Sequence, residues 1–196
     1  MSASPSGSKP SSFSELVARL DAAVVAPNDG TRCRQVKEAL EWGAERAGQL
    51  LTPDMLRPCP DRYARRLVHK DPAGRYSAVL MIWSPAQRTA LHDHAGSWCV
   101  ECVFQGTIRV DNYNRTANLC SEERIFDFEH VGTIRAGVGE AGALIPPYEY
   151  HVIANEESET AVTLHVYGGE MMRCTMFEPV PTGGYRATEK CLSYTE

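Results

Sequence analysis

The sequence has no long apolar run and no excess of basic charge. Among its 196 residues, 20 are Lys or Arg and 25 are Asp or Glu, which gives a formal net charge of -5 at pH 7. Nucleic-acid binding needs a basic patch, and a membrane-spanning helix needs about 20 apolar residues in succession. We therefore expect one soluble domain, large enough to bury its own core, that binds neither nucleic acid nor membrane.

The sequence also lacks a secretory signal and a disulfide framework. Its first residues, MSASPSGSKPSS, are rich in Ser, Pro and Gly and have no apolar core. The seven cysteines are odd in number and irregularly spaced, in a chain long enough to fold without disulfides. These features predict a disordered tail over 1–12 and a reducing, cytoplasmic location.

One pair of cysteines, Cys99 and Cys102, has the C-x-x-C spacing of redox and metal sites. The surrounding residues have the composition of a strand, on which positions i and i+3 face opposite sides. We therefore expect these two thiols neither to share a metal ion nor to form a redox pair.

The first part of the chain has helical periodicity. Residues 14–25, SELVARLDAAVV, have apolar positions at helical spacing, with Ser14 as a candidate N-cap. The residues Asn28, Asp29 and Gly30 are expected to end this helix, and a second helix is expected over 33–51. A proline-rich connection follows. We expect residues 13–60 to form a helical segment that packs on a barrel.

From Tyr63 onward, short runs rich in Val, Ile, Tyr and Thr alternate with Gly, Pro and Asn, as in an all-β sandwich or barrel. The expected strands are 63–69, 76–83, 98–105, 107–113, 124–129, 132–135, 143–145, 151–154, 161–167 and 174–178. Helices followed by strands predict a mainly β, α+β fold with a single barrel over 61–180. The polar residues 181–196 are expected to form a loosely held tail.

His92 and His94 form an H-x-H pair. On an extended strand, positions i and i+2 point to the same side, so both imidazoles can reach one metal ion. His151 follows a Pro-Pro turn much later and is a candidate third ligand. Three neutral imidazoles are typical of a site for iron, copper, nickel or zinc.

The spacing around these histidines resembles the two half-motifs of a cupin. The intervals are His92-x-His94, four residues, Cys99, six residues, Gly106, and then Pro146, four residues, His151, three residues, Asn155. Most cupins keep a glutamate ligand where this chain has Cys99. The chain therefore resembles the thiol dioxygenases, which lack that carboxylate, and among them the cysteine dioxygenase family. The resemblance implies a cupin barrel, or jelly roll.

Further matches to this family extend from about Tyr63 to Phe177. Tyr63 and Arg65 stand where the family keeps a tyrosine and a carboxylate-binding arginine. Alternation on a strand places Arg65 on the face of Tyr63, unlike the two neighbouring arginines. The planar guanidinium of Arg65 can pair with a substrate carboxylate through two hydrogen bonds.

The family's remaining positions include a polar row on one strand. Thr163, His165 and Tyr167 stand at i, i+2 and i+4, and we expect a hydrogen-bond relay from hydroxyl to imidazole to phenol. The resemblance implies that Tyr167 points at the substrate, that His165 supports it without binding the metal, and that Cys99 can join Tyr167 in a thioether. It also places Trp83 before the histidines and Cys174 at the site entrance.

The resemblance implies an enzyme that oxidises L-cysteine with dioxygen to cysteine sulfinate. Three histidines leave half of the positions of an octahedral ion free and leave its +2 charge uncompensated. Ferrous iron can reduce dioxygen and zinc cannot, so the open site and the resemblance together imply Fe(II), although geometry alone would also admit nickel or copper.

Two alternatives remain open. One is a dioxygenase for 3-mercaptopropionate or another small thiol. Relatives of that type usually carry Gln at the position of Arg65 and lack Cys99, so this chain sides with the cysteine enzymes. The other is a metal-binding cupin without catalysis. For the dioxygenase, the expected partners are a small thiol substrate and dioxygen, and the protein is expected to be a monomer or weak oligomer.

Overall fold

The computed structural model describes residues 12–196; residues 1–11, where most of the predicted tail falls, lie outside them. Three helices come first, α1 Ser12–Ala23, α2 Asp29–Ala44 and α3 Ala47–Leu50. The strands that follow are β1 Ala64–Lys70, β2 Ser77–Trp83, β3 Leu91–His92, β4 Cys99–Gln105, β5 Ile108–Cys120, β6 Ile125–Ala136, β7 Ala141–Leu144, β8 Tyr150–Ala154, β9 Ala161–Tyr167, β10 Arg173–Pro179 and β11 Tyr185–Cys191. The prediction of a mainly β barrel with N-terminal helices is confirmed.

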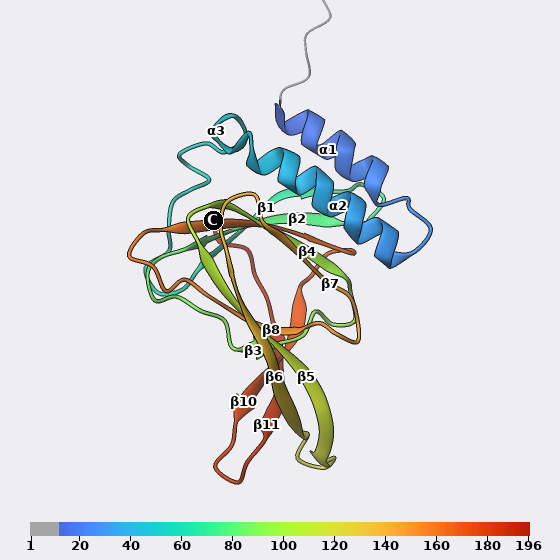
Figure 1. The fold of residues 1–196 in the computed structure, drawn as a ribbon, viewed down its shortest axis with the longest axis vertical. Helices are drawn as coiled ribbons and strands as arrows, with labels where there is room; N and C mark the ends of the chain where they lie inside the picture. Colours follow the sequence, from blue (N-terminus) through green and yellow to red (C-terminus); the bar gives the residue numbers. More distant parts are fainter. Residues whose placement is uncertain (1–11) are drawn as a thin grey trace, which may run out of the picture.

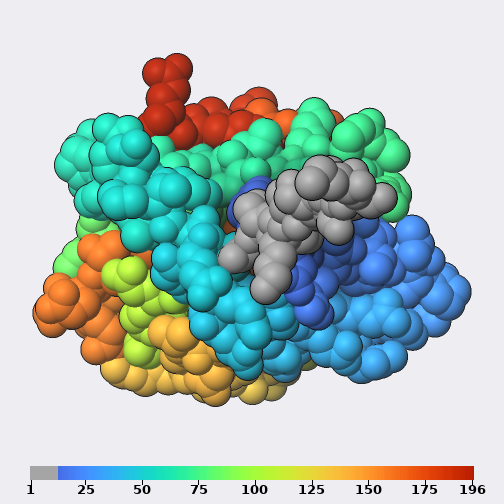
Figure 2. Space-filling model, turned by 90° about the horizontal axis from the view of Figure 1, so that it is seen from above, coloured from blue at the N-terminus to red at the C-terminus, as the bar shows by residue number. Residues whose placement is uncertain are grey.

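The strands form two antiparallel sets. One sheet has the order β1-β2-β9-β4-β7, and the other set, β10-β11-β6-β5-β8-β3, closes on itself. In Figure 1 the helices lie over the first sheet, and the β5–β6 and β10–β11 hairpins extend away from them. Seen from above, the helical segment in blue and cyan covers much of one face of the molecule (Figure 2).

The boundary between the first two helices differs from the prediction. Asn28 does not end α1 but caps α2, because its side chain accepts a hydrogen bond from the Thr31 amide at 2.9 Å. Asp29 then lies in the first turn, where a negative charge favours the helix dipole. Helix α1 already includes Ser12, so Ser14 lies inside it and is not its N-cap.

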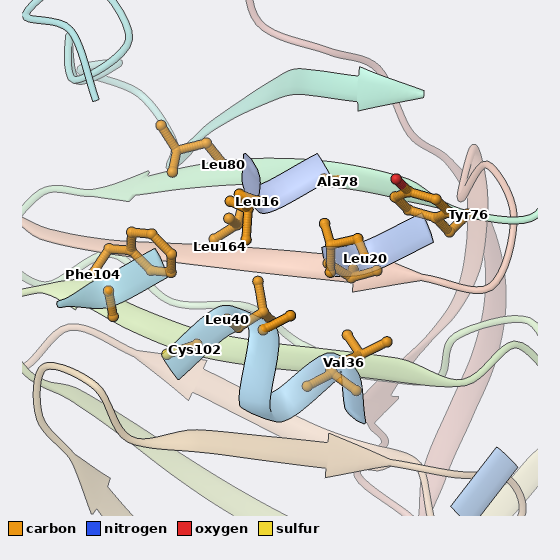
Figure 3. Close-up of a cluster of buried hydrophobic side chains, with 14 of the residues drawn as sticks. Leu16, Leu20, Val36, Leu40, Tyr76, Ala78, Leu80, Cys102, Phe104 and Leu164 are labelled. Carbon is orange, nitrogen blue, oxygen red and sulfur yellow. The ribbon is translucent and has the colours of Figure 1, made fainter. Parts of the chain in front are cut away.

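The helices bury their apolar faces against the first sheet. This core includes Leu16, Leu20, Val36, Leu40, Tyr76, Ala78, Leu80, Cys102, Phe104 and Leu164 (Figure 3). Every residue of β2 and β9 is buried, since one face of each strand meets the helices and the other faces the barrel interior. The helices thus pack on the outer face of the sheet, and its inner face points into the barrel.

Alternation along β4 separates the two cysteines of the C-x-x-C segment. Cys99 belongs to the cluster inside the barrel, and Cys102 belongs to the cluster under the helices. All seven cysteines of the chain are free thiols. The prediction that Cys99 and Cys102 do not act as a pair is confirmed.

Some strand predictions and the prediction for the C-terminal tail are wrong in extent. Residues 124–129 and 132–135 belong to one strand, β6, which pairs with the long β5. The polar residues 181–196 are not a loose tail, because Tyr185–Cys191 forms β11 between β10 and β6. Most of β11 is exposed, and within this strand only Ala187 is buried. Its polar sequence therefore resembles that of a loop. The strand is held by its backbone pairing with β10 and β6.

The chain after β11 crosses back over the barrel. The amide of Leu192 donates to the Met172 carbonyl, and the amide of Thr195 donates to the Arg65 carbonyl at 2.7 Å. The last residues therefore cover the start of β1. Within 12–196, no helix is both long enough and apolar enough to cross a membrane.

Candidate active site and metal centre

The three predicted metal ligands converge inside the barrel. His92 ends β3 and is paired directly with His151 on β8, and their Nε2 atoms lie 3.3 Å apart. The ring of His94 lies 5.3 Å from that of His92 and 4.9 Å from that of His151, measured between centroids. One nitrogen from each of the three lies within 4.8 Å of the others. The tertiary structure thus brings the three imidazoles to a single point.

His94 reaches this point differently from the way alternation on a strand predicts. Strand β3 ends at His92, and Ala95 and Gly96 turn the backbone through positive φ angles. Asp93 fixes the turn, because its carboxylate accepts hydrogen bonds from the amides of Ala95 and Thr175. A loop anchored to β10 therefore aims the imidazole of His94.

The donor set fits a divalent transition metal. His94 and His151 are almost fully buried, and burial lowers the pKa of all three imidazoles below the usual histidine value. They therefore stay neutral, which is the form that binds metals. The Nδ1–H of His92 donates to the Ala90 carbonyl at 3.0 Å and leaves Nε2 as its free donor atom.

Arg65 is buried in the same cavity. Only 5% of it is exposed, its Nη2 donates to the Met171 carbonyl, and its guanidinium lies 4.9 Å from the centre of the Tyr194 ring. Its Nη1 has no hydrogen-bond partner in the part of the chain that the structure describes. A buried cationic nitrogen without a partner is costly, so this position favours an anionic ligand.

Tyr63 and Arg65 both line the cavity, whereas Arg66 points away from it. Tyr63 stacks on Trp83 with ring centroids 4.4 Å apart. Arg66 donates to the carbonyls of Arg57 and Glu196 at the surface, each at 2.7 Å. The alternation predicted for this segment is therefore observed, and only Arg65 among its arginines faces the histidines.

Cys99 and Tyr167 are direct partners across β4 and β9. Both are buried, with exposed fractions of 0% for Cys99 and 3% for Tyr167. Burial raises the pKa of the thiol and of the phenol well above their usual values, so both remain protonated at neutral pH. The ring of Tyr167 lies 6.0 Å from that of His94, which places this pair beside the metal ligands.

The predicted polar relay exists only in part. Thr163 and His165 are joined at 2.7 Å through Nε2, and the indole N–H of Trp83 donates to the Thr163 hydroxyl at 2.9 Å. No hydrogen bond joins His165 to Tyr167 among residues 12–196, and their ring centroids are 6.0 Å apart. The other nitrogen of His165 instead faces a carboxylate, that of Glu101, at 3.3 Å.

Glu101 is the site residue that the sequence reasoning missed. It lies on β4 two positions after Cys99, hence on the interior face of a strand whose other inward residues are apolar. Burial raises the pKa of its carboxyl to about 8. A charged residue on an inward position of a predicted strand was the signal that could have identified it.

Two cavities meet the site. The one lined by Tyr63, Arg65, His92, His151, Tyr167 and Cys174 measures only about 20 Å³, so its walls must move to admit a substrate. A larger one, about 580 Å³, lies between α2 and β4–β7 and reaches Glu101 and Thr163 from the other side. The small cavity holds the histidines and the free Arg65 nitrogen, so the chemistry belongs there. Burial raises the pKa of Cys174 at its edge to about 11.

Comparisons with solved structures give distant likenesses. A protein of Thermus thermophilus is 21% identical, with 59% of this chain and 91% of that chain covered and a TM-score of 0.46. A protein from Klebsiella pneumoniae subsp. pneumoniae with a double-stranded β-helix domain is 17% identical, with 70% and 93% covered and a TM-score of 0.45. The cupin domain of Schizosaccharomyces pombe Cnp3 is 15% identical, with 55% and 60% covered and a TM-score of 0.39.

The family comparison is more direct. The model of the family described as cysteine dioxygenase type I matches residues 1–179, which include all three histidines, Arg65 and the Cys99–Tyr167 pair. That family implies a metal, and the three converging imidazoles provide a site for one. The chain belongs to the cysteine dioxygenase type I family, and its fold is the mainly β cupin barrel of a thiol dioxygenase-like protein.

Proposed function

We propose that this protein is an iron(II)-dependent dioxygenase that oxidises L-cysteine to cysteine sulfinate. One observation carries the choice of a carboxylate-bearing thiol: the buried Nη1 of Arg65 has no partner in the described chain, and Arg65 lines a cavity together with His92 and His151. A small thiol with a carboxylate would supply the missing acceptor. The overall reaction, RSH + O2 → RSO2H, needs no other reductant because sulfur loses the four electrons that dioxygen gains.

The metal would be held by His92, His94 and His151. Iron(II) bound there supplies the redox capacity to activate dioxygen, which neutral imidazoles and a free coordination site permit. The chain contributes by gathering the reactants in one buried place, since positioning alone can account for several kcal/mol, on the order of 7–11, of a barrier. His92 and His151 are held in place by the β3–β8 pairing, and Asp93 holds the loop that carries His94.

Arg65 would bind the substrate carboxylate and so set the position of the thiol. Met171 and Tyr194 hold the guanidinium on two sides, which leaves Nη1 directed to the cavity. Tyr63, fixed by stacking on Trp83, lines the cavity beside Arg65 and would bound the substrate on that side. A substrate without a carboxylate would leave the buried charge unpaired and would bind weakly.

Tyr167 and Cys99 would act beside the sulfur of the substrate. The phenol hydroxyl stays protonated and can donate a hydrogen bond to an anionic sulfur or oxygen. Because the two side chains are already cross-strand partners, we also propose that they join in a thioether. That step removes the thiol hydrogen and one ring hydrogen, and dioxygen is the oxidant that accepts them.

The proposal is tested by dioxygen consumption after anaerobic loading with Fe(II). Parallel samples receive L-cysteine and 3-mercaptopropionate, and the sulfinate product is quantified. Uptake matched by an equal amount of cysteine sulfinate, and weak with the second thiol, supports the proposal. Uptake mainly with 3-mercaptopropionate would retain the metal site and the dioxygenase but reject the substrate, and no uptake with either would favour a non-catalytic cupin.

A further inference from the structure

We propose that, once a metal is bound, Glu101 is a positioning residue whose ionised carboxylate accepts hydrogen bonds from the Nδ1–H groups of His151 and His165, so that Nε2 of His151 is presented to the metal. This inference rests on the proposed metal site and not on the choice of thiol. It gives the Thr163–His165 pair a second connection, to a metal ligand, in place of the one predicted toward Tyr167.

The carboxylate lies between the two imidazoles, with one oxygen toward each. Oε2 of Glu101 lies 3.3 Å from Nδ1 of His165, and Oε1 lies 3.8 Å from Nδ1 of His151. Both nitrogens and Oε2 are buried and have no hydrogen-bond partner in the described part of the chain. Buried polar groups rarely remain unsatisfied. A small rotation of the Glu101 side chain would satisfy all three atoms together.

The direction of the hydrogen bonds follows from Trp83. Its indole N–H can only donate, and it donates to the Thr163 hydroxyl. The remaining proton of Thr163 then goes to Nε2 of His165, at 2.7 Å. If Nε2 of His165 were the donor instead, the Thr163 hydroxyl would accept two hydrogen bonds, and its own proton would find no acceptor among residues 12–196. Nε2 of His165 is therefore the acceptor, and Nδ1 carries the proton that faces Glu101.

The orientation of His151 follows from the positions of its two ring nitrogens. Its Nδ1 faces Glu101, whereas its Nε2 lies 3.3 Å from Nε2 of His92, on the opposite side of the ring. Glu101 is thus one imidazole away from the metal position and is not itself a ligand there. Carboxylates placed in this way fix the tautomer and the ring orientation of metal-binding histidines and make the ligating nitrogen more basic. A divalent cation at Nε2 would in turn favour the ionised carboxylate.

The position of Glu101 also separates it from the cupin glutamate. That residue is replaced by Cys99, and Glu101 stands two residues later on the same face of β4. Glu101 therefore does not take the place of that glutamate as a metal ligand, because its oxygens point at the Nδ1 atoms of the histidines. We expect Glu101 to hold His151 in place through Nδ1, on the side of the ring that faces away from the metal.

The first test reads the histidine tautomers directly. Long-range ¹H–¹⁵N NMR spectra of the ¹⁵N-labelled, Zn(II)-bound protein should show protons on Nδ1 of both His151 and His165. On adding Zn(II), the Nε2 resonance of His151 should shift and that of His165 should not. A proton on Nε2 of His165 in the Zn(II)-bound protein would overturn the inference.

The second test measures metal affinity by Co(II) titration against a competing chelator. Glu101→Gln and Glu101→Leu should each weaken binding about 10–100-fold, the usual effect of removing such a partner. Glu41→Gln is the matched control, because Glu41 lines the same large cavity but pairs with Lys37 at the surface, and the Co(II) affinity of this variant should be unchanged. Circular dichroism confirms that each variant is folded.

The outcomes separate this inference from the proposed function. If the wild-type protein binds Co(II) and both Glu101 variants bind it equally well, the role of Glu101 is refuted and the metal site stands. If the wild-type protein binds no Co(II), the proposed function and this inference fail together. Should the Leu variant not fold, the Gln variant and the wild-type tautomers still decide the question.

Discussion

Arg65→Gln is the substitution that most directly tests how the substrate is held. Glutamine keeps a polar side chain near the Met171 carbonyl but removes the positive charge that faces the histidines. Nη2 is already used by that carbonyl and Nη1 has no partner in the described chain. At least one charge-assisted hydrogen bond to the substrate is therefore lost, worth about 1.5–3 kcal/mol.

This energy corresponds to a loss of about 10- to 150-fold in kcat/KM for L-cysteine, since roughly 1.4 kcal/mol is a factor of ten. Cysteamine, which is cysteine without its carboxylate, makes no such bond. The assay is dioxygen uptake with both thiols for the wild-type and variant enzymes, and the ratio of the two losses isolates the carboxylate contribution.

Arg66→Gln is the matched control, because Arg66 lies on the outer face of the same strand and contacts only surface carbonyls and the chain end. Its kcat/KM for both thiols should equal that of the wild type. The reasoning is refuted if Arg65→Gln keeps full cysteine activity, or if it impairs cysteine and cysteamine equally, since an equal loss would indicate structural damage.

Three further predictions concern the crosslink and stability. After prolonged turnover, the protein should lose the mass of one H2, and peptides of Cys99 and Tyr167 should appear joined; Cys99→Ala should abolish both changes, and separate peptides after turnover of the wild type would contradict the link. The hydrogen bonds from Arg75 hold the pKa of Asp71 well below its usual value, so Asp71 stabilises the fold above the unfolded pKa of about 4 and loses this effect as pH falls through the lower folded value. In urea unfolding, Asp71→Asn should therefore be less stable than the wild type at neutral pH, with a gap that narrows in acid; a gap independent of pH would reject the assignment. Leu40→Ala, in the fully buried contact between α2 and the sheet, should cost about 2–5 kcal/mol of unfolding free energy yet leave Co(II) affinity unchanged.

Sequence reasoning located most of the strands because their patterns are local. Strand β9 begins and ends where the pattern predicts, and its residues Ala161–Tyr167 are the apolar and β-branched run that a doubly buried strand requires. The prediction failed for Tyr185–Cys191, which is polar and mostly exposed. This strand forms because β10, the other arm of its hairpin, and β6, which is distant in sequence, offer backbone partners.

The candidate site likewise has features that local patterns predict and features that they do not. Residue spacing and the family resemblance together were enough to nominate His92, His94, His151 and Arg65, because short motifs preserve which side chains a strand or turn can present. The loop that turns His94 inward depends on β10, and the burial of Arg65 depends on Tyr194; no local pattern connects either residue to its neighbour.

The sequence and its family resemblance determined the fold class, the histidine set and the face of β1 that carries Arg65, since these depend on alternation and spacing along single segments. Only the tertiary structure decided that Glu101 stands behind His151, that His165 faces Glu101 and not Tyr167, and that Cys99 meets Tyr167 across two strands. The physical reason is that hydrogen-bond direction and strand register are set by atoms from separate elements, whose relative positions exist only once the barrel has closed.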